Sequence, residues 1–203
     1  LSYTWLPTPV TSLEGLQDMV NLAIIQIDRN AVTDLSPLSG LSNLRTLRLG
    51  AAGRTERLDL SLEPLSGLPN LHTLELNFTS INDLEILAAL PDLTNLHLTN
   101  CGLERIDNLT TLDLWNLTLD WNPIRDVDAL LAFPNLRRVE LRDTPVDFSD
   151  DSPDRAVLDA LRERGVQVLP VESELPRLWS TETWIPAAGG RGFFWMRPGR
   201  RRD

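Results

Sequence analysis

Apolar residues recur along this chain in a fixed order that repeats every 22 residues. In one copy they are Leu65, Leu68, Leu71, Leu74 and Leu76, and in the next they are Leu87, Leu90, Leu93, Leu96 and Leu98. The second halves stay in step, since Ile81 and Leu84 are matched by Leu103 and Ile106. The unit reads LxxLxxLxxLxLxx(N/C/T)x(L/I/V)xx(L/I). Such self-similarity at a fixed period indicates a repeat architecture.

Four further copies complete a set of six. Their apolar positions are Leu16-Met19-Leu22-Ile25-Ile27, Leu38-Leu41-Leu44-Leu47-Leu49, Leu109-Leu112-Trp115-Leu117-Leu119 and Leu130-Phe133-Leu136-Val139-Leu141. The copy that begins at Leu109 is one residue short, and we place Trp115 at its third apolar position. The copy that begins at Leu38 runs for 27 residues and carries about five extra residues within 51–63. The alternation Leu58-Leu60-Leu62 in this insert predicts a short extended segment on the convex side.

The LxL part of each copy predicts a short strand. Its two leucines alternate with a solvent-facing residue and therefore point inward from an extended segment. Three residues further on stands a mostly polar position, which we call the ladder, occupied by Asn30, Ala52, Thr79, Cys101, Asn122 and Thr144. A polar side chain there can bond backbone groups that the turning chain would leave unpaired. The other leucines fill the core from the far side through 3-10 or extended segments, because 22 residues leave little room for a full helix.

A single copy cannot bury its apolar face alone, so stacked copies must share one continuous core. We therefore predict an α/β fold, a right-handed solenoid with short parallel strands on its concave face and 3-10 or extended segments on its convex face. Six repeats occupy about 16–146, and residues 1–15 form a half-repeat with Tyr3 and Trp5 in the LxL place.

Residues 147–169 are predicted to close the carboxyl end of the stack with a helix and a strand. The run 150–154 (DDSPD) provides a capping side chain and a proline in the first turn. Ala156, Val157, Ala160 and Leu161 give the helix an apolar stripe, Gly165 ends it, and residues 166–169 alternate like a final strand. The acidic residues at the helix start lack the EF-hand ligand pattern, so we interpret them as capping residues rather than calcium ligands.

Three phrases of the sequence resemble a known family. They begin at Val10 (VTSLEGL), Val32 (VTDLSPLSGLSNL) and Ile81 (INDL), and they are similar to the internalin-type leucine-rich repeats of bacterial surface proteins. The resemblance covers roughly residues 1–146 and implies a curved solenoid whose concave sheet binds a host or bacterial protein. It also implies a secreted or cell-surface location.

A similar 22-residue repeat occurs in the leucine-rich regulatory subunit of protein phosphatase 1. The alternative is therefore an intracellular adaptor or regulatory subunit, cytoplasmic and tethered through the carboxyl-terminal tail. Residues 1–9 lack the charged start and apolar run of a signal peptide, but the chain begins with Leu rather than Met. The sequence therefore leaves the location open.

In this geometry the solvent-facing strand residues line the concave sheet in three columns. The central column is Gln26, Arg48, Glu75, His97, Thr118 and Glu140. The flanking columns are Ile24, Thr46, Thr73, Asn95, Asn116 and Arg138 on one side, and Asp28, Gly50, Asn77, Thr99, Asp120 and Arg142 on the other. Neighbouring strands lie about 4.8 Å apart, so Arg48 is expected beside Glu75, and Glu75 beside His97. The surface suits a protein epitope, and the predicted contact residues are the central column with Asn77, Asn95, Asp120, Arg138 and Arg142.

Catalysis finds no support in the sequence. His72 and His97 are the only histidines, and a hydrolytic triad or metal site needs convergent partners that repeats scatter along a ladder. We expect a surface hydrogen bond between His97 and Glu75 rather than an acid/base pair. The single cysteine, Cys101, excludes an intrachain disulfide, and we expect it to be a buried ladder residue rather than a nucleophile. We predict neither enzymatic activity nor a cofactor or metal.

Charge and composition narrow the choice of partner. The net charge is −10, and an acidic body argues against nucleic acid, which needs clustered cations. Residues 170–203 form a basic, aromatic tail whose composition is compatible with contact to a membrane or an acidic surface. It lacks a clean amphipathic period, so we predict a flexible segment. Trp115 and Trp121 are interpreted as core or ladder-adjacent packing, although exposed tryptophans would favour binding. We expect a monomer that binds a protein partner.

Overall fold

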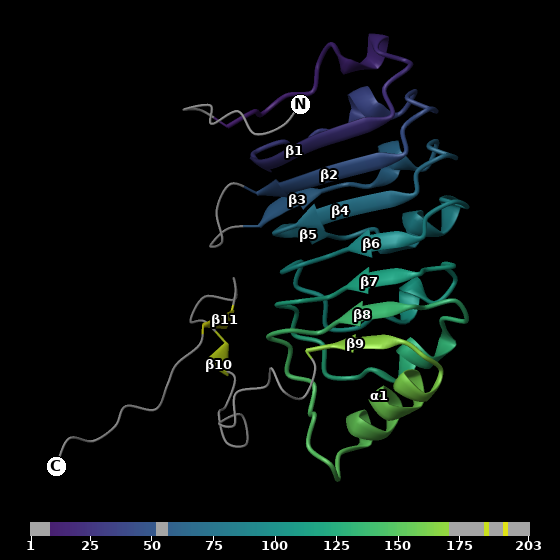
Figure 1. Cartoon of the computed structure of the whole chain (residues 1–203). Coiled ribbons are helices and arrows are strands. Elements are labelled where there is room, and N and C mark those ends of the chain that lie inside the picture. The colour runs from purple at the N-terminus through teal and green to yellow at the C-terminus, as the bar shows by residue number, and fades with distance from the viewer. Residues whose placement is uncertain (1–8, 52–56, 171–184, 187–192, 195–203) are drawn as a thin grey trace, which may run out of the picture.

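The computed structural model describes residues 9–51, 57–170, 185–186 and 193–194. Its main body is a stack of parallel strands in one curved sheet (Figure 1). The sheet runs in the order β1 (Ile24–Asn30), β2 (Thr46–Ala51), β4 (Thr73–Asn77), β6 (Asn95–His97), β7 (Asn116–Thr118), β8 (Arg138–Glu140) and β9 (Gln167–Leu169). Each strand of the sheet pairs with the strand of the next repeat, so the predicted solenoid is confirmed.

Short 3-10 helices lie on the return path between the strands. They are η1 (Leu16–Asp18), η2 (Ser36–Leu38), η3 (Glu63–Leu65), η4 (Leu84–Ala89), η5 (Asp107–Leu109) and η6 (Asp128–Ala132). Pro37 and Pro64 stand in the first turns of η2 and η3, where a missing N–H leaves no intrahelical bond unmade. Within the described ranges, no helix is both long and apolar enough to cross a bilayer.

The core consists of the repeated leucines. Leu74, Leu76, Leu96 and Leu98 point inward from β4 and from β6 with the residue after it, and none of the four has any exposed surface. Leucines from the 3-10 side, such as Leu87, are equally buried. Complete burial of one such side chain contributes about 1.5–3 kcal/mol relative to its exposed state. Because the rows are continuous from repeat to repeat, the burial of each leucine depends on the repeats beside it.

In five repeats the chain takes a left-handed conformation just before the ladder. Five non-glycine residues there have φ between 54° and 62°: Arg29, Phe78, Asn100, Trp121 and Asp143. The ladder residues that follow are Asn30, Thr79, Cys101, Asn122 and Thr144; Ala52, the remaining ladder position, lies outside the described residues. Since the left-handed region is sparsely populated by non-glycine residues, the turn must be held by bonds from its neighbours.

Asn122 shows how the ladder holds this turn. Its Oδ1 accepts hydrogen bonds from the backbone N–H groups of Cys101 (2.9 Å) and Leu103 (3.1 Å) in the preceding repeat. Its Nδ2 donates to the carbonyl oxygens of Leu98 (2.6 Å) and Leu119 (2.9 Å). The side chain is completely buried. One amide thus satisfies backbone groups of two repeats, which is the predicted role of the ladder.

The short repeat differs from its prediction. Leu114, with no exposed surface, fills the third apolar position, whereas Trp115 is 38% exposed. The missing residue therefore lies between Leu112 and Leu114, where the preceding repeat has two residues between Leu90 and Leu93. Placing Trp115 in the core was wrong because Leu114 keeps the two-residue spacing to Leu117 that the strand requires.

The insert in the second repeat forms an extra strand, as predicted. β3 (Leu58–Leu60) pairs in parallel with β5 (Thr79–Ile81) and makes a separate two-stranded sheet beyond the ends of β2 and β4. Arg57 extends the contact by donating from Nε to the Asn100 carbonyl at 2.9 Å. Its guanidinium packs against Gly102, which has φ +76°. This left-handed conformation favours a glycine at that position.

The helix–strand cap is also present. α1 (Pro153–Glu163) begins after Ser152, whose hydroxyl accepts the Arg155 N–H at 3.0 Å, and Gly165 follows it with φ +84°. Its buried side chains are Val157, Leu158 and Leu161. The predicted stripe was therefore displaced: Ala156 is exposed, and Leu158 packs in the core.

The two ends of the chain are described only in part. Leu13 is buried and the Val10 N–H donates to the Asn30 side chain at 2.7 Å, but Tyr3 and Trp5 lie outside the described residues. In the tail, β10 (Ile185–Pro186) and β11 (Phe193–Phe194) pair antiparallel. The remainder of 171–203 lies outside the described residues, so the flexibility of the tail stays a prediction.

Candidate binding face

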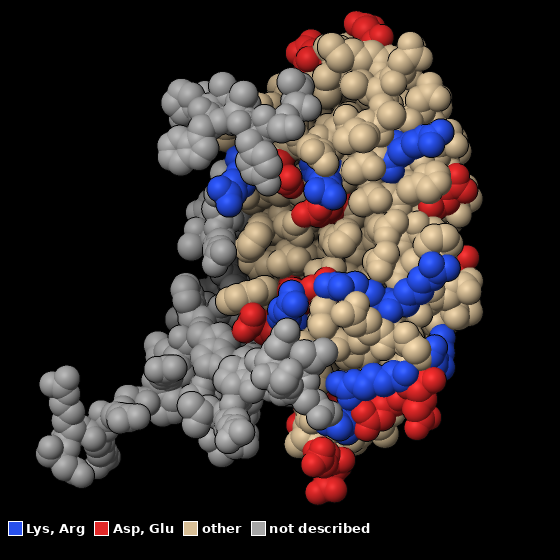
Figure 2. All heavy atoms as spheres, viewed as in Figure 1, with Lys and Arg blue, Asp and Glu red and all other residues tan. Residues whose placement is uncertain are grey.

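The strand register places the predicted columns side by side. Within the central column the pairs follow one another from Gln26–Arg48 and Arg48–Glu75 to Glu75–His97, His97–Thr118 and Thr118–Glu140. In the flanking columns, Asn95 pairs with Asn116 and Gly50 with Asn77. Strand β9 extends the sheet, with Gln167 beside Arg138. The candidate residues therefore share one continuous surface, seen from the front in Figure 2.

One ion pair marks the amino side of this surface. The Nε of Arg48 lies 3.3 Å from Oε2 of Glu75, although the atoms do not form a hydrogen bond. The amide of Asn77 donates to the other carboxylate oxygen of Glu75 and accepts the Thr99 N–H at 3.2 Å. The side chain of Arg48 is 44% exposed. Such exposed ion pairs contribute about 0–1 kcal/mol.

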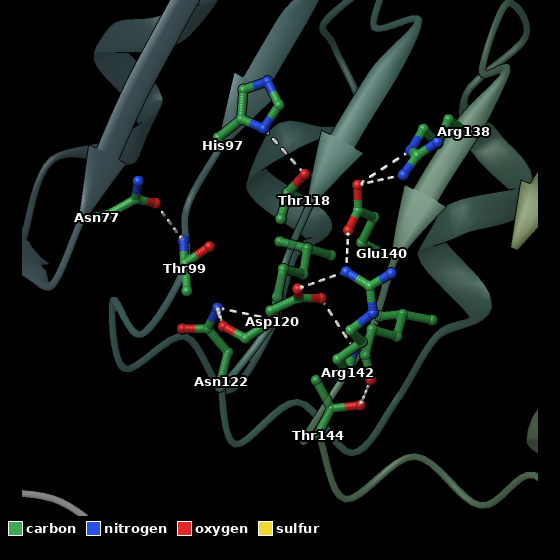
Figure 3. A network of polar contacts seen from close by, with 12 residues as sticks. Asn77, His97, Thr99, Thr118, Asp120, Asn122, Arg138, Glu140, Arg142 and Thr144 are labelled. Atoms are coloured by element: carbon green, nitrogen blue, oxygen red, sulfur yellow. Dashed lines mark hydrogen bonds and ion pairs between the residues drawn. The ribbon is translucent and has the colours of Figure 1, made fainter. Parts of the chain in front are cut away.

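A larger charged cluster occupies the carboxyl side (Figure 3). Glu140 accepts from Arg138 Nε at 2.9 Å through one carboxylate oxygen and from Arg142 Nη1 at 2.8 Å through the other. Arg138 also donates to Gln167 at 3.0 Å. Glu140 is thus held between two guanidiniums, and its side chain is only 14% exposed.

Asp120 completes this cluster at the end of β7. Its Oδ1 accepts the backbone N–H of Arg142 at 2.9 Å, and its Oδ2 lies 3.8 Å from Arg142 Nη1. Burial raises the pKa of Asp120 to about 6, against the opposing effect of that hydrogen bond. We call Asp120, Arg138, Glu140 and Arg142 the carboxyl-side cluster. Its two cations balance its two carboxylates when Asp120 is ionised.

His97 lies between the two charged groups but bonds neither. Its Nδ1 shares a hydrogen bond of 2.9 Å with the Thr118 hydroxyl, rather than with Glu75 as expected. Burial lowers the pKa of His97, against the opposing effect of Glu75 and Glu140. The imidazole is therefore neutral at pH 7.

The centre of the sheet carries no charged side chain. We call Asn95, His97, Thr99, Asn116 and Thr118 the neutral band; it covers the outward-facing residues of β6 and β7 and the second residue after β6. Asn116 donates from Nδ2 to Oδ1 of Asn95, so the two amides are linked across the strands. In Figure 2 this uncharged area separates the blue and red atoms above and below it. The sheet thus presents neutral hydrogen-bonding groups between two compensated charged sites.

Two tryptophans at the ends of β7 are exposed, which corrects their interpretation as core packing. Trp115 is 38% and Trp121 47% exposed. The Arg137 guanidinium lies 4.2 Å from the centroid of the Trp115 ring, a cation–π contact. The sequence held only a weak signal for Trp121, because the residue before the ladder is polar in three repeats (Arg29, Asn100 and Asp143) but apolar in two others (Ala51 and Phe78).

Cys101 is buried in the ladder, with 4% of its surface exposed. Its Sγ donates to the Leu76 carbonyl at 2.8 Å, and burial raises the pKa of the thiol to about 11. Since the thiolate is the nucleophilic form, this thiol is unreactive at neutral pH. Within the described ranges, no three His, Cys, Asp or Glu side chains come together as metal ligands would.

Comparison with solved structures identifies the fold. Internalin C2 of Listeria monocytogenes superposes with a TM-score of 0.50 and 29% sequence identity over 72% of each chain. A leucine-rich-repeat protein of Leptospira interrogans gives 0.60 and 21%, over 75% of this chain and 38% of its own. The plant peptide hormone receptor RGFR1, solved in complex with RGF2, gives 0.51 and 19%, over 64% of this chain and 22% of its own. No protein-family model and no curated protein sequence matches the chain.

The repeat, the parallel sheet and these likenesses together define a leucine-rich-repeat protein. Its solenoid is internalin-like. The leucine-rich-repeat fold typically binds proteins on its extended concave surface and is generally non-catalytic.

Proposed function

We propose that this protein binds a protein partner through the concave sheet. The observation that carries the proposal is the continuous register of the three columns from β1 to β8, which gives one extended polar surface. The proposed contact residues are Gln26, Arg48, Glu75, Asn77, Asn95, His97, Thr118, Asp120, Arg138, Glu140 and Arg142. Rigid, extended surfaces of this kind suit macromolecular partners, because affinity can be collected over many small contacts.

A small molecule fits this face less well. Small-molecule sites are concave and enclose most of the ligand. The structure does contain an open cavity of about 480 Å³, but it lies between η2 and η3, lined by Thr33, Ser36, Ser61 and Glu63 among others. That cavity lies on the return path of the solenoid and not on the sheet. Nucleic acid is disfavoured by the acidic body, and Arg48, Arg138 and Arg142 of the sheet are already paired with carboxylates.

The test exchanges an ion pair on the face. In the variant Arg48→Glu/Glu75→Arg, the net charge and the pairing are kept while the pattern of charge is reversed. The matched control is Arg105→Asp/Asp107→Arg, an exchange of an exposed pair at 2.9 Å beside η5. Cross-linking followed by mass spectrometry, on a pull-down from the native source, identifies the partner and supplies it for both variants.

We expect the exchange on the sheet to abolish capture of the partner and the control exchange to leave it unchanged. Both variants should keep the circular dichroism spectrum of the parent, because neither touches the core or the ladder. Undiminished capture by the sheet variant would rule out the concave face as the binding surface. Loss in both variants would point to an effect of charge pattern in general.

A further inference from the structure

Trp121 combines two features that folding alone does not favour. It has φ +62°, a left-handed conformation that is uncommon for non-glycine residues and most readily adopted by Asn and Asp. Asn100 and Asp143 occupy the same turn in the adjacent repeats, and Arg29 and Phe78 occupy it further along the stack. Trp121 also leaves 47% of its surface in solvent. A large aromatic side chain that is held in this conformation and leaves nearly half of its surface exposed is a candidate contact residue.

Trp115 stands at the opposite end of the same strand. It directly precedes β7, and the matching residue of the neighbouring repeat is Thr94, since both carbonyls receive the paired N–H groups of the next strand. The neighbouring repeat thus has a polar residue, Thr94, at the position of Trp115. Five residues separate the two tryptophans, so their Cα atoms lie at most about 20 Å apart along the chain. Exposed tryptophans are the side chains most enriched among residues that dominate binding energy.

Between the two tryptophans the chain carries Asn116 and Thr118 of the neutral band and then Asp120, whose carboxylate lies 3.8 Å from Arg142 Nη1. The other residues of the neutral band belong to the neighbouring repeat of β6. The neutral groups of the band include the Nε2 of His97, the Oδ1 of Asn116 and the hydroxyl of Thr99, none of which bonds another side chain of the described ranges. The charged groups on either side are compensated: Arg48 by Glu75, and the cations of the carboxyl-side cluster by its own carboxylates. The protein as a whole is strongly acidic, but the side chains of the neutral band are uncharged, and the Arg137 guanidinium beside them is held over the Trp115 ring.

The geometry points to an extended, uncharged segment of about six residues in a polypeptide partner, which lies along β7 between Trp115 and Trp121. Backbone and side-chain amides of the segment pair with the neutral band. Apolar side chains near its ends pack on the two indoles. This inference rests on the proposed function and adds to it the position, length and charge of the bound segment.

Random 12-residue peptides displayed on phage supply the ligands for the test. The purified full chain selects binders, and the affinities of the synthesised peptides are measured by calorimetry at low and high salt. The variants are Trp121→Asn and Trp115→Thr, which copy the neighbouring repeats. Leu131→Ala is the control, because Leu131 is 42% exposed but lies on η6, away from the sheet. Thr99→Arg places a large side chain in the neutral band and reports on the sheet itself.

We expect the selected peptides to have a net charge near zero and an affinity that changes less than about threefold with salt, since few counterions are released. Trp121→Asn should weaken binding at least about tenfold and Trp115→Thr about fivefold, as for aromatic anchors. Leu131→Ala should leave the affinity within about twofold. The Trp121→Asn variant should melt no lower than the parent, so that its loss of affinity is not a loss of fold.

Other outcomes overturn the inference in recognisable ways. Peptides that are strongly basic and salt-sensitive would show that the acidic body, not the neutral band, selects the ligand. Peptides that lose affinity with Thr99→Arg but not with Trp121→Asn would leave the proposed function standing and remove the role of the tryptophans. Peptides indifferent to both variants would contradict the inference and the use of the concave face. Failure to enrich any peptide, or binding to a glycan array instead, would also overturn the inference.

Discussion

The ladder and the columns of the concave sheet are two sets of polar residues with different roles. Both repeat with the solenoid, and both contain asparagine and threonine. The ladder residue Asn122 is completely buried and bonds backbone groups of two repeats, whereas Asn116 on the sheet is partly exposed and bonds another side chain. A buried polar atom without a partner costs far more than an exposed one. The ladder is therefore constrained by the backbone, and the columns are free to vary with the ligand.

The concave sheet itself contains a second contrast. Arg48 and Glu75 lie 3.3 Å apart without a hydrogen bond, while Glu140 accepts hydrogen bonds from both Arg138 and Arg142. The Arg48–Glu75 pair on the amino side can therefore rearrange at low cost. The carboxyl side is a network in which each charge orients the next.

The ladder should respond most strongly to mutation. Asn122→Ala removes the acceptor for two backbone N–H groups and the donor for buried carbonyls, so we expect a loss of about 3 kcal/mol in the free energy of unfolding. Asn116→Ala, in the same repeat, should cost less than about 0.5 kcal/mol because its groups reach water. Urea denaturation followed by circular dichroism measures both. Equal losses would show that burial does not separate the two rows.

Mutation of the carboxyl-side cluster should cause the second largest loss in the free energy of unfolding. Glu140→Gln removes the carboxylate that two guanidiniums share, and hydrogen bonds to charged groups contribute about 1.5–3 kcal/mol before exposure to solvent reduces them. We expect a loss of about 1 kcal/mol, measured by urea denaturation. Glu85→Gln, on the exposed surface of η4, is the control and should be neutral. An equally small effect at Glu140 would mean that the network is not coupled.

Asp120 gives this network a pH dependence of known sign. Its pKa is raised from 3.8 to about 6 in the folded protein, so the unfolded chain loses this proton first as the pH rises. Its contribution to stability therefore falls between about pH 4 and pH 6 and is constant above that window. Below pH 4 both states are protonated and the group contributes nothing to the pH dependence.

The variant Asp120→Asn isolates this effect, because Asn Oδ1 can still accept the Arg142 N–H. Relative to the parent, Asp120→Asn should gain roughly 1 kcal/mol between pH 4 and pH 7, since one pKa unit corresponds to about 1.4 kcal/mol and solvent screening reduces the total. Melting of both proteins across that range measures the difference. A difference that does not change with pH would show that Asp120 ionises normally in the fold.

The fold could be predicted because its determinants are periodic. The core leucines, the ladder and the strand register all repeat at 22 residues, so an error in one copy is corrected by the others. The insert was recognised for the same reason, since Leu58-Leu60-Leu62 keeps the period of a strand. Helix α1, which does not repeat, was predicted with its apolar stripe displaced to include Ala156 in place of Leu158.

The site could be placed only in part. Periodicity determined which residues face the concave side, but it did not determine how their side chains pair. His97 was expected to bond Glu75 and bonds Thr118, because Glu75 is engaged by Arg48 and Asn77. Both tryptophans were interpreted as packing residues and are exposed, and Trp115 was misplaced because the period fails in the short repeat. Side-chain partners depend on distances of a few tenths of an ångström, which the repeat pattern does not contain.

The pair at the amino side should give the smallest effect and completes the contrast between the two charged sites. A double-mutant cycle on Arg48→Met and Glu75→Gln should give a coupling energy below about 0.5 kcal/mol, the value typical of exposed pairs. The matching cycle on Arg142→Met and Glu140→Gln should give about 1 kcal/mol, because that pair is hydrogen-bonded at 2.8 Å. Stabilities from urea denaturation supply both cycles. Equal coupling energies for the two pairs would mean that the amino and carboxyl sides of the sheet are equally rigid.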